Sequence, residues 1–76
     1  MTNLQINALL YDGARVEMDG VVINSWFDDS TGEKNIELVW INPLREVGFI
    51  ANGMTPSELK GRLEMEIRAW KMVGKG

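Results

Sequence analysis

The sequence contains no cysteine and no histidine among its 76 residues. Without cysteine the chain has no disulfides, thiolate nucleophiles or zinc–thiolate centres. Without histidine it lacks the commonest general base and the commonest metal ligand. Any chemistry would rest on carboxylates, amines, hydroxyls or the single tyrosine, Tyr11. In so short a chain these absences argue against an enzyme, and we expect no cofactor and no metal.

Long hydrophobic runs are also missing. No apolar segment approaches the roughly 20 residues that a membrane-spanning helix requires. The first ten residues include no lysine or arginine, so they do not resemble a signal peptide. We therefore expect a cytoplasmic protein that does not contact membranes.

Basic residues are outnumbered, with 8 Lys and Arg against 11 Asp and Glu and a net charge of −3. Residues 1–33 carry six acidic side chains and one basic one, whereas residues 34–76 carry five acidic and seven basic ones. This asymmetry fits an acidic end that attracts a basic partner, but a chance distribution is the favoured interpretation because a few charges either way would erase the difference. An acidic chain is a poor candidate for nucleic-acid binding.

The length predicts one domain, residues 1–76. A domain of this size buries only about 60% of the surface that its unfolded chain exposes, so its stability is marginal. With disulfides excluded and no metal site evident, self-association is the common remaining source of stability. Two-fold dimers are the commonest assemblies, and we expect a homodimer formed by packing two sheets or by pairing two edge strands.

Short segments of strand-like pattern, separated by turn residues, predict strands at about 3–11, 15–18, 21–27, 35–42 and 47–51. In the first, Leu4, Ile6, Ala8 and Leu10 alternate with other residues, and Asp12-Gly13 then predicts a hairpin with a three-residue loop.

The pair Asp19-Gly20 is either a second turn or a bulge within one longer strand. Both alternatives place the same apolar residues on a common face: Val16, Met18, Val21 and Ile23. The segment 28–33 predicts a hairpin loop in which Gly32 adopts a positive φ.

A helix is predicted at about 56–73. Thr55, Pro56 and Glu58 form a capping box with a proline in the first turn. Its apolar stripe consists of Leu59, Leu63, Ile67, Trp70 and Val73. The predicted fold is therefore α+β, an antiparallel meander of four to five strands with one C-terminal α-helix packed on one face.

The predicted sheet has more apolar residues than one covered face needs. Leu9, Val22, Val39 and Ile41 fall on the outer face, with Tyr11 and Trp26 as neighbours. Such a patch is typical of an association surface, unless the sheet curls into a half-barrel or the strand parity changes at Gly20. The side chains that we predict to contact a protein partner are Tyr11, Trp26, Trp40, Asp28 and Asp29.

Two alternatives use the C-terminal helix. A nucleic-acid-associated regulator would use the basic side chains Lys60, Arg62, Arg68 and Lys71, although glutamates on the same helix dilute their charge. A small-ligand-binding protein would use a pocket between helix and sheet, lined by Trp40 and Trp70. The carboxylates of 28–33 do not follow the spacing of a calcium-binding loop, and we interpret them as a solvated hairpin loop.

In size and acidity the chain resembles the small accessory proteins of phages and mobile elements, many of which bind and modulate a host protein. The resemblance rests on size and composition. It implies a location in the host cytoplasm. We therefore expect a non-enzymatic protein-interaction module whose partner is another protein.

Overall fold

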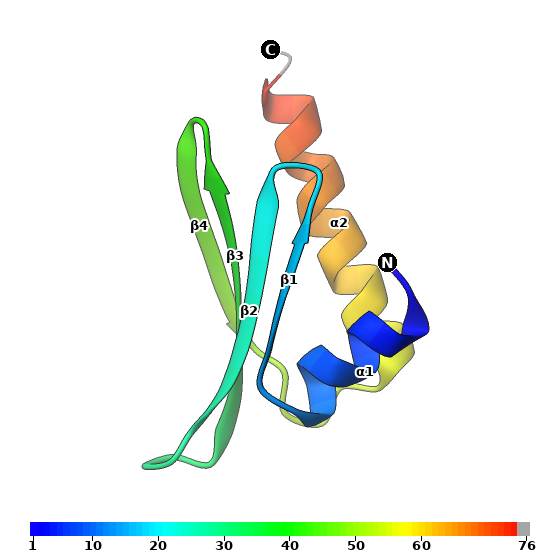
Figure 1. Ribbon diagram of the computed structural model, residues 1–76, viewed down its shortest axis with the longest axis vertical. Helices are drawn as coiled ribbons and strands as arrows, with labels where there is room; N and C mark the ends of the chain where they lie inside the picture. Colours follow the sequence, from blue (N-terminus) through cyan, green and yellow to red (C-terminus); the bar gives the residue numbers. More distant parts are fainter. Residues whose placement is uncertain (75–76) are drawn as a thin grey trace.

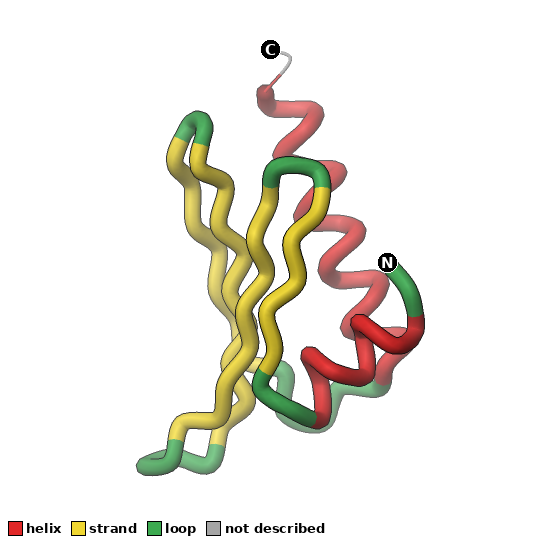
Figure 2. Tube along the Cα trace, viewed as in Figure 1, coloured by secondary structure: helices red, strands yellow, loops and turns green. Residues whose placement is uncertain are grey.

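The computed structural model describes the backbone of residues 1–74 and the side chains of residues 1–71. Four antiparallel strands form one sheet in the order β1-β2-β3-β4, and both helices lie on one side of it (Figures 1 and 2). Along the chain the elements are α1 Asn3–Tyr11, β1 Ala14–Met18, β2 Val21–Asp28, β3 Glu33–Ile41, β4 Leu44–Ile50 and α2 Pro56–Gly74. The prediction of an α+β meander with a C-terminal helix is confirmed, with four strands rather than five.

The segment predicted as the first strand, 3–11, is the helix α1. A capping box begins it: the Gln5 N–H donates to Thr2 Oγ1 (3.2 Å), and the Thr2 N–H donates to Gln5 Oε1 (3.0 Å). Ile6, Leu9 and Leu10 are buried, at the spacing of one helical face. The alternation that indicated a strand was therefore coincidental, and Asp12-Gly13 joins a helix to β1 instead of closing a hairpin.

The pair Asp19-Gly20 is a turn and not a bulge. Met18 lies opposite Val21, so two residues connect β1 to β2. Asp19 has φ 47° and Gly20 has φ 79°, the two positive values that a type I′ hairpin turn requires. This register confirms that Val16, Met18, Val21 and Ile23 share the side of the sheet that faces the helices.

The remaining strands follow the predicted turns closely. Gly32 adopts φ 74° in the loop between β2 and β3, as predicted. Asn42 and Pro43 form the turn between β3 and β4, where Ile41 lies opposite Leu44. β4 therefore begins three residues earlier than the strand predicted at 47–51.

The core lies between the sheet and the two helices. The capping box of α2 is present, because the Glu58 N–H donates to Thr55 Oγ1 (3.2 Å) and the Thr55 N–H donates to Glu58 Oε1 (3.2 Å). In the predicted stripe, Leu59 and Leu63 are buried, Ile67 and Trp70 pack against the core, and Val73 lies outside the described side chains. The buried apolar side chains are Ile6, Leu9, Leu10, Val16, Val21, Ile23, Ile36, Leu38, Trp40, Ala51, Leu59 and Leu63.

Two buried polar side chains hold the end of α1 against the sheet. Ser25 Oγ accepts from the Ala14 N–H (3.1 Å) and donates to the Asp12 carbonyl (3.3 Å). Lys34 is only 3% exposed, and its ammonium donates to the same carbonyl while lying 4.2 Å from the centre of the Phe27 ring. A cation at the C-terminal end of a helix is favourable, and this interaction offsets part of the cost of burying the Lys34 ammonium.

Candidate functional site

One face of the sheet carries no covering element from the described part of the chain, and we call it the open face (Figure 1). Because side chains alternate along a strand, every second residue of the four strands points to this side. Its apolar members are Val22, Trp26, Val39, Ile41, Leu44 and Ile50. Ile41 is 70% exposed and Leu44 is 72% exposed, although both are large and apolar. Such a patch on a small protein is typical of an association surface.

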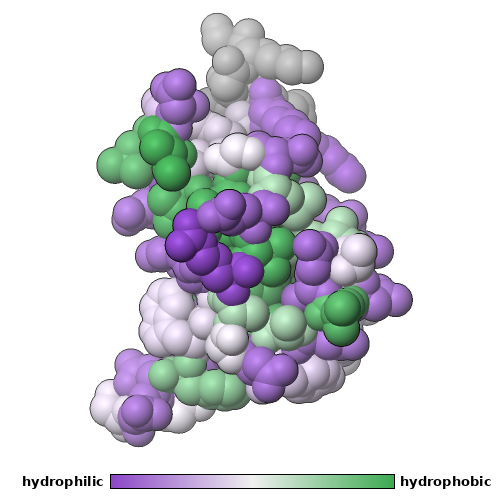
Figure 3. Space-filling model, viewed as in Figure 1, coloured by the Kyte–Doolittle hydropathy of each residue, from purple (hydrophilic) through white to green (hydrophobic). Residues whose placement is uncertain are grey.

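These apolar side chains gather at the two ends of the face. At one end Val22 lies opposite Val39, and Ile41 lies opposite Leu44. In Figure 3 hydrophobic side chains are visible over the tip of the β3–β4 hairpin, which belongs to this end. At the other end the β3 residue Asn35 lies opposite both Trp26 and Ile50. The open face therefore has two apolar areas with a more polar band between them.

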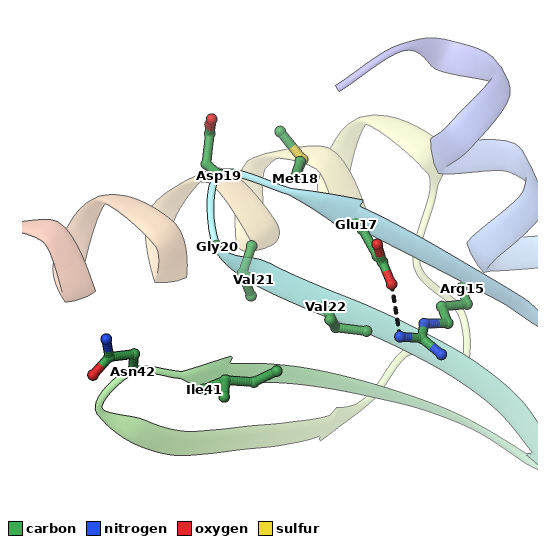
Figure 4. Close-up of a pocket in the computed structure, with 9 residues that line it drawn as sticks. All are labelled: Arg15, Glu17, Met18, Asp19, Gly20, Val21, Val22, Ile41 and Asn42. Atoms are coloured by element: carbon green, nitrogen blue, oxygen red, sulfur yellow. Dashed lines mark hydrogen bonds and ion pairs between the residues drawn. The ribbon is translucent and has the colours of Figure 1, made fainter.

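The first area contains a shallow hollow of about 560 Å³, which we call the hairpin-end hollow. The close-up in Figure 4 shows Val22 and Ile41 beside the ion pair between Arg15 and Glu17 (2.6 Å). Both charged side chains are 65% exposed, so their pairing contributes little to stability. Both charges remain accessible to a partner that docks on the apolar area.

The second area contains a hollow of about 440 Å³, which we call the Gly48 hollow. Gly48 has no side chain, and it lies opposite Glu37 on β3. Trp26 and Ile50 also line the hollow. A lysine or arginine from a partner would find a carboxylate and an aromatic surface here, a combination that suits a cation.

The charges of the open face are mainly negative. Glu17, Glu37 and Glu46 point to this side, and among the residues of the four described strands Arg15 is the one cation that does so. A surface of this kind attracts a partner whose contact area is apolar and positively charged.

The structure separates the five predicted contact residues. Trp26 lies on the open face and is 44% exposed. Tyr11 is exposed at the end of α1, beside Phe27 and Lys34, away from the open face. Trp40 is 4% exposed, with its ring centre 5.7 Å from that of Trp70. The prediction of Trp40 as a surface contact is therefore wrong, because its position along β3 points to the helices.

The strand register tests which of the apolar residues predicted on the outer face of the sheet lie there. Val22, Val39 and Ile41 do lie on the open face, whereas Leu9 is buried within α1. Leu44 was missed because the last strand was predicted to begin at residue 47, whereas Ile50 lay within that predicted strand but was not assigned to the outer face. The alternation of Leu44, Glu46, Gly48 and Ile50 is the sequence signal that identifies them.

Asp28 and Asp29 lie at and beyond the end of β2, at the end of the sheet opposite the hairpin-end hollow (Figure 2). The Asp28 carboxylate accepts from the Ser30 N–H (2.9 Å) and from Ser30 Oγ (2.6 Å). These hydrogen bonds lower the pKa of Asp28 below its usual 3.8. Asp28 therefore stabilises its own loop, while Asp29 is exposed.

The basic side chains of α2 are partly engaged within the protein. The Arg62 guanidinium lies 4.3 Å from the centre of the Phe49 ring, and Nε pairs with Glu66 (3.2 Å). Lys71 Nζ lies 3.9 Å from an Asp19 oxygen, whereas Arg68 is exposed and Lys60 half-buried. This arrangement does not present the four cations as one basic surface.

The two tryptophans predicted to line a small-ligand pocket belong to the packing of the core. Trp40 and Trp70 contact one another, and the Arg45 guanidinium lies 4.7 Å from the centre of the Trp70 ring. The two tryptophans therefore contribute to packing between α2 and the sheet.

No helix within residues 1–74 is long and apolar enough to cross a membrane. The described residues also contain no group of three acidic side chains that could hold a metal ion. Comparison with protein families, curated proteins and solved structures found no match to this chain.

Proposed function

We propose that this protein is a non-enzymatic interaction module that binds another protein through the open face of its sheet. One observation carries the proposal: six apolar side chains lie on a sheet face that no described element covers. A sheet packed by helices on one side normally has a polar second face. Leaving this apolar area in water is unfavourable, and a partner surface would remove it from water.

The residues that line the Gly48 hollow indicate which side chains a partner would place against it. A lysine or arginine that enters the hollow would pair with Glu37 and lie against Trp26. Hydrophobic residues around that cation would cover Val39 and Ile50. The partner is therefore a protein with a basic side chain at the centre of an apolar contact area.

The test is selection of binders from a displayed peptide library. We expect the selected peptides to combine lysine or arginine with aromatic or aliphatic residues. Trp26→Ala and Glu37→Gln should each weaken their binding tenfold or more, as expected for residues at the centre of an interface.

Leu4→Ala is the matched control, because Leu4 is also an exposed apolar side chain but lies on α1. It should leave binding unchanged. Peptides that bind wild type and Trp26→Ala equally well, while both proteins give the same circular dichroism spectrum, would show that the open face is not the binding surface.

A further inference from the structure

The outer edge of β4 is free within the described structure. β4 pairs only with β3, and in Figure 1 it forms the outer rim of the sheet. The opposite edge, β1, has five residues and is packed against α1, whereas β4 has seven. A long unpaired edge strand offers a row of backbone groups to another strand.

The ladder between β3 and β4 fixes which backbone groups are available. Lys34 and Ala51 form the next pair of the ladder beyond Asn35 and Ile50. The Ala51 N–H donates to the Lys34 carbonyl (2.8 Å), so Lys34 and Ala51 are a hydrogen-bonded pair. Hydrogen-bonded pairs alternate along an antiparallel ladder, so Arg45, Val47 and Phe49 bond towards β3. The N–H and C=O groups of the intervening residues point away from β3, and these residues are Leu44, Glu46, Gly48 and Ile50.

The helix-facing side chains of β4 are also incompletely covered. Arg45, Val47 and Phe49 are each half-buried, whereas their neighbours Leu38 and Ile36 on β3 are fully buried. Val47 and Phe49 pack against the core from its margin. The core therefore ends at this edge with apolar surface still exposed.

We propose that β4 pairs with β4 of a second copy of this chain, antiparallel across a two-fold axis at Val47. Each four-stranded sheet then continues into its partner, and the helices of both copies lie on the same side. Leu44 lies opposite Ile50 of the second copy, and Glu46 lies opposite Gly48 of the second copy. All seven residues of β4 are paired in this register.

The sequence of β4 favours this register over its neighbours. If one β4 strand slides along the other from the proposed register, only a change of two residues in the pairing keeps the helix-facing sides of both copies on the same side of the sheet. One such shift places the two copies of Glu46 opposite one another, and like charges in that position are unfavourable. The other places Gly48 opposite itself and leaves Leu44 unpaired. In the proposed register Glu46 meets a glycine, which leaves room for its side chain.

Because the chain has no cysteine, a single introduced cysteine tests the register directly. Val47 lies on the axis as a pair without hydrogen bonds, for which the Cα atoms are about 4.5 Å apart, close enough for a disulfide. Under mild oxidation Val47→Cys should give a covalent dimer of twice the 8.6 kDa chain mass.

Two matched variants test the alternative dimers, which would form through the β1 edge or by packing of two open faces. Val16→Cys lies at the centre of the β1 edge, and Val39→Cys lies on the open face, in the apolar area beside the hairpin-end hollow. Neither should crosslink. Failure of Val47→Cys to crosslink, or faster crosslinking of either control, would overturn the proposal.

The wild-type chain should also be dimeric in solution by light scattering. Gly48→Pro should be monomeric, since it removes a donor that points away from β3 and leaves the ladder to β3 intact. A wild-type molar mass of 8.6 kDa at every concentration would overturn the proposal, as would a Gly48→Pro variant that remains dimeric.

The dimer does not rest on the proposed function. Because Gly48 lines the hollow that the proposed function uses, crosslinking of Val47→Cys is the test of the dimer that is independent of peptide binding. Trp26→Ala should lose peptide binding and keep the molar mass of the wild type. Gly48→Pro should change the molar mass.

Discussion

Lys34 is a lysine inside a small core, and its environment makes its charge costly. Removal from water lowers its pKa below the usual 10.5, and the nearby Asp12 carboxylate opposes that shift only in part. The folded protein therefore holds the Lys34 proton less tightly than the unfolded chain does. It follows that stability gained from this group appears as the pH rises through the folded pKa, and is complete above 10.5.

We therefore predict that the stability of wild type relative to Lys34→Met increases as the pH rises from neutral towards 10.5. The measurement is urea unfolding of both proteins across this range. Lys60→Met, at a half-buried position on α2, is the control for the effect of replacing any lysine by methionine outside the core. A stability difference that stays constant or falls as the pH rises would contradict the assigned environment of Lys34.

Trp26 and Trp40 show that residue type alone does not predict which face of a sheet a side chain occupies. Both are tryptophans in predicted strands, and the sequence suggested the same role for both. The register places Trp26 on the open face and Trp40 under α2. Which side of the sheet a residue faces depends on strand parity, and only neighbouring strands and helices fix which side is covered.

At the scale of elements, α1 is the main departure from what the sequence predicted. A strand at 3–11 would place Leu4 and Ile6 on the same face, whereas the helix places them on different faces. The structure leaves Leu4 80% exposed and Ile6 1% exposed.

Substitution with alanine distinguishes these two arrangements. Ile6→Ala should lower the free energy of unfolding by about 2–4 kcal/mol, because it leaves a cavity in the core. Leu4→Ala should change it by less than about 0.5 kcal/mol, as expected for an exposed position. Chemical denaturation monitored by tryptophan fluorescence measures both. Equal losses for the two variants would indicate that the side chains share an environment, as in a strand.

For the molecule as a whole, the proposed dimer couples stability to concentration. A chain of 76 residues has a small core, and pairing across β4 would cover the half-buried side chains of that strand. Unfolding would then separate the two copies, so mass action favours the folded state at higher concentration.

We predict that the Tm of wild type rises by about 5 °C for each tenfold increase in concentration, where the dimer is populated. Gly48→Pro should show a Tm independent of concentration. Differential scanning calorimetry measures both, and equal concentration dependence in the two proteins would contradict pairing through β4.

The sequence by itself predicted α2 and the approximate positions of the strands from β1 onward, but it left Asp19-Gly20 open as a turn or a bulge and began β4 too late. Local signals underlie these predictions: Gly32 and Pro43 mark turns, Asp19-Gly20 marks a turn or a bulge, and the Thr55 capping box begins α2. These signals depend on backbone preferences and neighbouring residues, so they act without the rest of the fold. The Thr2–Gln5 capping box is a signal of the same kind, and it was present in the sequence at α1.

Only the tertiary structure decided which surfaces are buried. Leu9 and Trp40 became core residues, Lys34 was buried at the end of α1, and Leu44 was placed on the open face. These outcomes depend on where both helices pack, and the segments involved are far apart in the sequence. The candidate interaction surface follows from this packing, because the helices cover one face of the sheet and leave the other to solvent (Figure 1).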